Sequence, residues 1–203
     1  MTKKICILDY GSGNVASVFN MINFLGYECK ITNDIDYLEK SSHIILPGVG
    51  SYSTAMKKIK EKISFYDLEK QVLVNKKPFL GICVGMQILS TKGYEFEICE
   101  GFNWISGIVK KIENKKLPHI GWNDIKVKND SVLLKNLDLE QNFYFVNSYH
   151  FVPEKTDHIV SISNYGQKFC SIIQKDNIFG VQFHPEKSQK AGQILIKNFL
   201  NFS

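Results

Sequence analysis

A short apolar segment that runs straight into a helix through a glycine-flanked cysteine most constrains the fold of this 203-residue chain. It reads Pro78-Phe-Leu-Gly-Ile-Cys83-Val-Gly85-Met-Gln87, with Gly81 and Gly85 each two residues from Cys83. Such spacing is typical of a nucleophile elbow, where strand and helix pass too closely for side chains. The sulfur then lies at a helix N-terminus, where unpaired N–H groups and the helix dipole favour the reactive thiolate. We therefore interpret Cys83 as a nucleophile rather than an ordinary buried cysteine.

Strands and helices alternate up to this elbow. Apolar runs predict strands at residues 4–9, 28–32, 43–46 and 79–82, and apolar residues at helical spacing predict helices within 15–25 and 52–74. Asn14 is expected to cap the first helix and Gly26 to end it. This alternation predicts an α/β fold with a mostly parallel central sheet flanked by helices.

The pattern changes after the elbow helix. Residues 104–127 and 143–183 contain short β-type runs separated by polar turns, which predicts an additional antiparallel β portion. Residues 188–202 return to helical spacing. Because no linker, repeat or low-complexity segment separates these parts, we expect a single domain over residues 1–203.

Composition excludes several classes of protein. The net charge of +5 comes with 25 lysines and no arginine, whereas nucleic-acid-binding proteins use arginine for bidentate contacts, so no nucleic-acid partner is expected. The five cysteines include no CxxC pair, and the first residues lack the pattern of a signal peptide, which indicates a reducing, cytoplasmic setting. No apolar run reaches the roughly 18 residues of a membrane span, so no membrane association is expected. No metal or other cofactor is expected either.

A base for the cysteine is expected in Gly180-Val-Gln-Phe-His184-Pro-Glu186. Pro185 favours an extended conformation at His184, and residues two apart in an extended segment point the same way. His184 is therefore predicted to take the thiol proton, while Glu186 orients the imidazole and stabilises its charged form. The other four histidines have no carboxylate at this spacing.

An oxyanion needs N–H donors beside the nucleophile. The backbone N–H of Val84 is one candidate, because it is the first in the elbow helix. The glycine-rich turn Pro47-Gly-Val49-Gly50 follows the preceding predicted strand, and we expect it to supply the second donor.

Together these motifs resemble those of the class I, triad-type glutamine amidotransferases. The shared motifs are Pro47-Gly-Val-Gly50, Gly81-Ile-Cys-Val-Gly-Met-Gln87 and Phe183-His-Pro-Glu186, and the resemblance spans the whole chain. Three further segments are similar to the glutaminase subunits of imidazole glycerol phosphate synthase: Asp9-Tyr-Gly-Ser-Gly-Asn14, Pro118-His-Ile-Gly-Trp-Asn123 and the ending Phe183-His-Pro-Glu-Lys-Ser188.

The resemblance implies that Cys83 hydrolyses the side-chain amide of glutamine through a glutamyl thioester. Ammonia would then pass to a separate barrel-type synthase subunit in a heterodimer that makes imidazole glycerol phosphate and AICAR in histidine biosynthesis. By matching position, the substrate contacts would be Gly48, Gln87, Glu95, Asn147, Ser148 and Tyr149. The surface facing the synthase would include Tyr10, Asn14, Pro118, His119, Trp122 and Asn123.

The sequence leaves alternatives open. The run Ser90-Thr-Lys-Gly-Tyr-Glu-Phe-Glu97 is less acidic than is usual in the histidine pathway, so the same chemistry could feed a sugar-amidating enzyme. Gly11-Ser12-Gly13-Asn-Val-Ala16 matches the dinucleotide-binding pattern, with Asp34 or Asp36 about 20 residues later. A catalytically silent subunit is disfavoured because Cys83, His184 and Glu186 are all present.

Overall fold

An eight-stranded sheet forms the centre of the computed structural model, which describes residues 3–114, 116–138 and 141–202. The strand order is β2-β1-β3-β4-β14-β13-β12-β9. The first five are parallel: β2 (Glu28–Thr32), β1 (Lys4–Leu8), β3 (His43–Gly48), β4 (Phe79–Cys83) and β14 (Ile178–Val181). The remaining strands continue the sheet in antiparallel fashion: β13 (Gln167–Lys175), β12 (Ile159–Tyr165) and β9 (Lys126–Val127). The predicted α/β architecture with an added antiparallel portion is confirmed.

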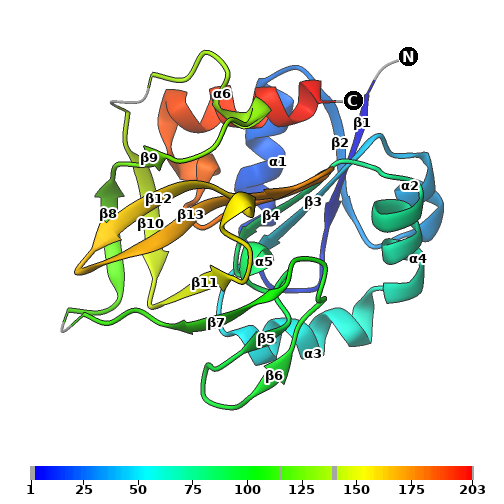
Figure 1. The fold of residues 1–203 in the computed structure, drawn as a ribbon. Helices are drawn as coiled ribbons and strands as arrows, with labels where there is room; N and C mark the ends of the chain where they lie inside the picture. The colour runs from blue at the N-terminus through cyan, green and yellow to red at the C-terminus, as the bar shows by residue number, and fades with distance from the viewer. Residues whose placement is uncertain (1–2, 115, 139–140, 203) are drawn as a thin grey trace.

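Helices cover both faces of this sheet (Figure 1). The helices α1 (Val15–Phe24) and α6 (Gln189–Asn201) lie together on one face, and α3 (Tyr52–Lys62) lies on the other. The remaining helical segments are α2 (Ile35–Lys40), α4 (Phe65–Glu69), α5 (Val84–Gln87), a π-helical turn at Lys70–Val74 and three 3₁₀ turns at Val132–Leu134, Thr156–His158 and Pro185–Lys187. Strands β3, β4 and β14 are buried along their whole length, as parallel strands covered on both faces should be.

Two smaller sheets complete the structure. One has the order β11-β7-β5-β6 and the other pairs β10 with β8. Their strands are β5 (Lys92–Gly93), β6 (Cys99–Glu100), β7 (Gly107–Lys111), β8 (His119–Asn123), β10 (Phe143–Asn147) and β11 (Tyr149–Pro153). These pairings are antiparallel as predicted, except that β5 and β7 run parallel.

The ends of α1 differ in part from expectation. Gly26 adopts a φ of +83° just beyond the helix, which suits its expected role in ending it. The Asn14 side chain does not cap the helix. Its amide donates instead to the carboxylate of Glu186, in the 3₁₀ turn Pro185–Lys187. Within the described residues, none of the helices has the length and apolar character needed to cross a membrane.

Candidate active site

Cys83 stands at the junction of β4 and α5 with a φ of +56°. The two flanking glycines allow the chain to fold back on itself at this point. A Cβ added at Gly81 would lie 2.3 Å from the Gly85 carbonyl oxygen, and one added at Gly85 would lie 2.0 Å from the Leu46 carbonyl oxygen. Because neither distance is possible for a real side chain, the elbow requires glycine at both positions.

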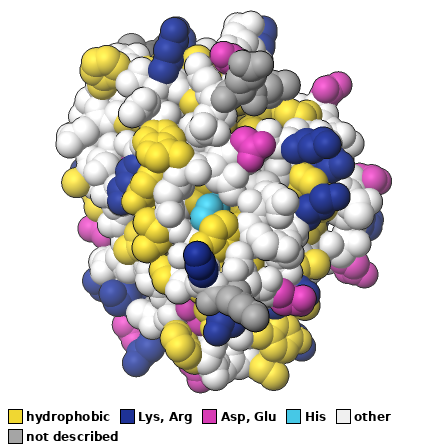
Figure 2. Space-filling view, turned by 90° about the vertical axis from the view of Figure 1, so that its left-hand side faces the viewer, with side chains coloured by type: hydrophobic (Ala, Val, Ile, Leu, Met, Phe, Trp, Pro, Cys, Tyr) yellow, Lys and Arg dark blue, Asp and Glu magenta, His cyan; other side chains and the backbone are white. Residues whose placement is uncertain are grey.

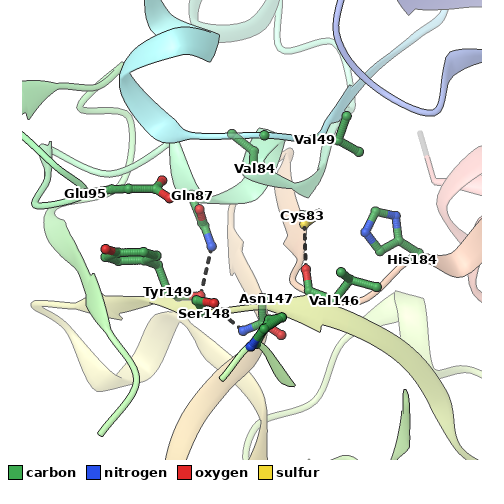
Figure 3. A pocket seen from close by; sticks show the side chains of 12 residues that line it. Val49, Cys83, Val84, Gln87, Glu95, Val146, Asn147, Ser148, Tyr149 and His184 are labelled. Atoms are coloured by element: carbon green, nitrogen blue, oxygen red, sulfur yellow. Dashed lines mark hydrogen bonds between the residues drawn. The ribbon is translucent and has the colours of Figure 1, made fainter. Parts of the chain in front are cut away.

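His184 reaches the cysteine because β14 lies directly beside β4 in parallel register, with Val181 opposite Ile82. The carboxyl ends of these two strands therefore meet at the same sheet edge. The backbone N–H of His184 donates to the Tyr144 carbonyl at 2.8 Å, which ties this segment to β10. Figure 3 shows the His184 imidazole on one side of the Cys83 sulfur and Gln87 with Glu95 on the other.

Glu186 and His184 form a buried pair. The distance from His184 Nδ1 to Glu186 Oε1 is 2.8 Å, and the two side chains are 4% and 1% exposed. The Asn14 amide donates to the same Oε1 at 3.0 Å, whereas Oε2 is buried without a hydrogen bond from any described residue. Burial by itself would lower the pKa of His184, but hydrogen bonding and charge attraction from Cys83 and Glu186 outweigh it and raise that pKa.

The Cys83 sulfur has two further polar neighbours. Its thiol donates to the Val146 carbonyl at 3.8 Å, as Figure 3 shows, and the Gln182 amide Nε2 donates to the sulfur at 3.7 Å. The thiol therefore has an acceptor at Val146, and the sulfur has a donor at Gln182.

A pocket of about 250 Å³ opens over the sulfur. Most residues predicted for the site line it. They are Val49, Gly50, Cys83, Val84, Gln87, Glu95, Asn147, Ser148, Tyr149 and His184, together with Pro118 and Val146. Gly48 does not line the pocket: it is buried beneath the turn, where an added Cβ would lie 2.6 Å from the Gly85 nitrogen.

Polar groups on the pocket wall are held by the backbone. Gln87 Nε2 donates to the Tyr149 carbonyl at 3.0 Å, and Asn147 Nδ2 donates to the same oxygen at 3.1 Å. The Glu95 carboxylate accepts the Tyr52 backbone N–H at 2.8 Å. Burial raises the pKa of Glu95, and the bond from Tyr52 acts in the opposite direction.

The glycine-rich turn after β3 lies beside the elbow. Gly50 has a φ of +93°, and the Ser12 hydroxyl donates to the Val49 carbonyl at 2.9 Å. The loop before α1 therefore holds the turn that carries the candidate oxyanion donors.

The residues predicted to face a partner differ in exposure: Pro118 and Trp122 are exposed, and Asn14 and Asn123 are half-buried. Tyr10 and His119 are buried, and His119 is stacked between Phe145 and Tyr165, so the structure leaves neither side chain free for a partner. Trp122 is 48% exposed on β8 and packs edge-on against Tyr144. Figure 2 looks onto the side of the molecule where Figure 1 draws β8, and it shows hydrophobic side chains gathered near the middle of that face.

The dinucleotide alternative is not favoured. Gly11 and Gly13 have φ values of +78° and +135°, and a Cβ at Gly13 would lie 2.7 Å from the Pro47 carbonyl oxygen. Gly13 therefore serves a close approach between the loop before α1 and the end of β3. Asp34 caps α2 by accepting the Asp36 backbone N–H, so the acidic residue of the pattern also has a structural use. In the part of the chain that the structure describes, no group of three His, Cys, Asp or Glu side chains is arranged to hold a metal ion.

Besides Val146, sequence reasoning missed Gln182 near the sulfur. It is completely buried and bonded to both Cys83 and Gln87. The signal was its position two residues before His184, because alternate residues of an extended segment point the same way.

Comparisons with known proteins agree with this arrangement. The family model for glutamine amidotransferase class-I matches residues 6–202. The chain is 43% identical over 202 residues to imidazole glycerol phosphate synthase subunit HisH 1 of Campylobacter jejuni strain RM1221, covering 97% of this chain and 98% of the relative. It is 38% identical over 206 residues to subunit HisH of Pelagibacter ubique, covering 98% and 99%.

Solved structures show the same fold at lower sequence identity. PurLQS from Thermotoga maritima superposes with a TM-score of 0.78 at 19% identity, covering 99% of both chains. A glutamine amidotransferase from Thermotoga maritima superposes with a TM-score of 0.68 at 16% identity, covering 98% of this chain and 83% of the other. The chain is therefore a glutamine amidotransferase that belongs to the class I family and, within that family, to the HisH subunits of imidazole glycerol phosphate synthase.

Proposed function

We propose that this chain hydrolyses the side-chain amide of glutamine with Cys83 as nucleophile, His184 as base and Glu186 as the group that orients His184. The observation that supports this most is the buried His184–Glu186 pair beside the sulfur at the floor of a pocket. The raised pKa of His184 fits a histidine that holds a proton next to a thiolate.

The proposed reaction has two halves. His184 takes the thiol proton, and the sulfur attacks the amide carbon of glutamine to form a tetrahedral oxyanion. The backbone N–H groups of Val84 and of the Val49–Gly50 turn stabilise that charge. When the carbon–nitrogen bond breaks, His184 returns its proton to the nitrogen and ammonia leaves, so Cys83 carries a glutamyl thioester. Water, deprotonated by His184, then hydrolyses the thioester to glutamate.

The polar side of the pocket is proposed to select glutamine. Glu95 offers a carboxylate that suits the α-ammonium group of an amino acid, and Gln87, Asn147, Ser148 and Tyr149 line the same pocket with amide, hydroxyl and backbone groups. Gly48 supports this site from below rather than touching the substrate.

The test of the nucleophile combines substitution with labelling. Cys83→Ala should abolish glutaminase activity while the melting temperature stays within a few degrees, and Cys29→Ala should keep activity. A glutamine-like diazoketone should label Cys83 alone among the five cysteines, and glutamine should protect it. Labelling of Cys6, Cys29, Cys99 or Cys170 instead would contradict the assignment.

We further propose that the ammonia passes to a barrel-type synthase subunit bound at the face that carries β8. The relatives are named as subunits of imidazole glycerol phosphate synthase, and Ile120 and Trp122 expose apolar surface there. Asn14, Pro118 and Asn123 are retained in this proposed surface, whereas Tyr10 and His119 are left out because they are buried.

Trp122→Ala tests this surface. Because Trp122 is half-exposed, the isolated chain should remain folded, while affinity for the synthase falls and glutamate forms in excess of synthase product. Tyr66→Ala is the matched control, since Tyr66 is an exposed aromatic residue on α4. A large loss of thermal stability with unchanged affinity and product ratio would place Trp122 in the structural core instead.

The domain organisation, location and pathway of the chain belong to the same proposal. We expect one domain over residues 1–203, since one sheet joins both halves of the chain and the family model spans nearly all of it. A cytoplasmic location is supported by five unpaired cysteines. A sugar-amidating pathway is not favoured, because the relatives described above carry the name of the histidine-pathway enzyme.

A further inference from the structure

Gln182 is a fully buried amide with one end toward the Cys83 sulfur and the other toward Gln87. It follows β14 directly, between the buried side chains of Val181 and Phe183. Its Nε2 lies 3.7 Å from Cys83 Sγ, and its Oε1 accepts Gln87 Nε2 at 3.0 Å. An apolar residue would fill this space without burying a primary amide, which is costly unless its groups are bonded.

The bonding pattern sets the direction of both amides. Gln87 Nε2 donates to the Tyr149 carbonyl and to Gln182 Oε1, so both of its N–H hydrogens are used inside the protein. The Gln87 carbonyl oxygen is thereby left for the pocket that Gln87 lines. Because the carbonyl of Gln182 is occupied by Gln87, its NH₂ group is the end that meets the sulfur.

An N–H aimed at sulfur distinguishes the two protonation states of cysteine. A thiol sulfur is a weak acceptor, whereas hydrogen bonds to an ionised acceptor are about twice as strong as neutral ones. The amide of Gln182 therefore favours the thiolate over the thiol, in addition to any effect of His184.

We propose that Gln182 stabilises the Cys83 thiolate and holds Gln87 with its carbonyl oxygen turned toward the pocket. The second half rests on the proposed function, because only there does the Gln87 carbonyl meet glutamine. The first half concerns the sulfur alone and does not require turnover.

The experiment measures how alkylation of Cys83 by iodoacetamide depends on pH. Mass spectrometry of digested protein follows Cys83 separately from the other cysteines. In Gln182→Met, which keeps the length and volume of the side chain, the midpoint of the rate–pH curve should move up by about one pH unit. On the acid side of the midpoint, where the rate is proportional to the thiolate fraction, the rate at a given pH should fall about tenfold. An unchanged midpoint would overturn the proposal.

Gln71→Met is the matched control. Gln71 is equally buried, 2% exposed, and its side chain is bonded to Asn75 in a different part of the structure. This variant should lose comparable thermal stability and leave the Cys83 curve unchanged. An equal shift in the control would show that the effect is general loosening, and the proposal would fail.

Gln182→Leu gives an independent test should the methionine variant be unstable. The leucine side chain offers neither an N–H for the sulfur nor an oxygen for Gln87. The midpoint should rise as in Gln182→Met, and an unchanged midpoint would again overturn the proposal.

Steady-state kinetics separate this inference from the proposed function. The methionine variant should raise the KM for glutamine, because Gln87 is released, as well as lower kcat, and adding Gln87→Met should raise KM little further. A shifted alkylation curve in a protein that hydrolyses no glutamine would sink the proposed function and leave the thiolate role standing.

Discussion

At the scale of single residues, the Glu186 carboxylate links His184 to the loop before α1. One of its oxygens accepts hydrogen bonds from both His184 and Asn14. Asn14 comes from the segment that we place at the synthase-facing surface, and it makes no capping bond for α1. A displacement of this loop would therefore act on the position of the His184 imidazole through the Glu186 carboxylate.

His184 and Glu186 should contribute unequally to catalysis. His184→Ala removes the proton acceptor and should lower kcat by about 10³-fold or more. Glu186→Gln can still bond the imidazole but cannot stabilise its positive charge, so a smaller loss of about 10- to 100-fold is expected. Turnover is measured at saturating glutamine with partner present. Wild-type turnover in Glu186→Gln would reduce the triad to a dyad.

At the scale of elements, the site depends on how closely the elbow crosses its neighbours. The Gly85 position lies against the Leu46 carbonyl of β3, and Gly81 lies against the Gly85 carbonyl. The strand-to-helix switch, rather than the four-residue helix α5 itself, therefore sets the place of Cys83 in the sheet.

Gly81→Ala should destabilise the fold severely. The added methyl group would lie 2.3 Å from a backbone carbonyl oxygen that no side-chain rearrangement can move, so a loss of several kcal/mol or failure to fold is expected. Gly26→Ala is the control, because nothing lies within 4 Å of its Cβ position and only its φ of +83° is strained, at about 1–2 kcal/mol. Chemical denaturation of both variants compares the two costs, and equal losses would contradict the crowding argument.

Local patterns predicted the strands and the elbow well, because each carries its own signal in glycine spacing and apolar runs. They failed where a side chain bonds to a distant segment. Asn14 stands where a helix cap belongs, yet its partner Glu186 is 172 residues away. Likewise the buried position of His119 follows from stacking on Phe145 and Tyr165, which no neighbouring residue reveals.

At the scale of the whole molecule, two buried histidines link stability to pH. His43 and His150 are 2% and 4% exposed, and burial, reinforced by Lys3 and Lys110 respectively, lowers the pKa of each to about 4. Their unfolded pKa is about 6.5, so between about pH 6.5 and 4 the unfolded chain binds protons that the folded chain does not. Stability therefore falls as pH falls through this window.

The expected loss is about 2 kcal/mol per histidine by pH 5. His184 acts in the opposite direction: its pKa is raised, so its contribution is complete below about pH 6.5 and is lost progressively as pH rises from there through its folded pKa. This contribution is the same in wild type and in a variant of His150, so comparing the two proteins isolates His150. Urea denaturation at pH 7.5 and pH 5 measures the loss of unfolding free energy, and His150→Asn should make this loss smaller by about 2 kcal/mol. Equal pH dependence in the variant would show that His150 titrates normally.

The left-handed φ of +56° at Cys83 has a consequence beyond chemistry. Of the twenty residue types, glycine fits that backbone conformation with least strain, so the proposed nucleophile stands where the fold itself would favour glycine. Stability and activity thus pull this position in opposite directions. Glycine at this position would therefore relieve the backbone strain and remove the proposed nucleophile in the same step.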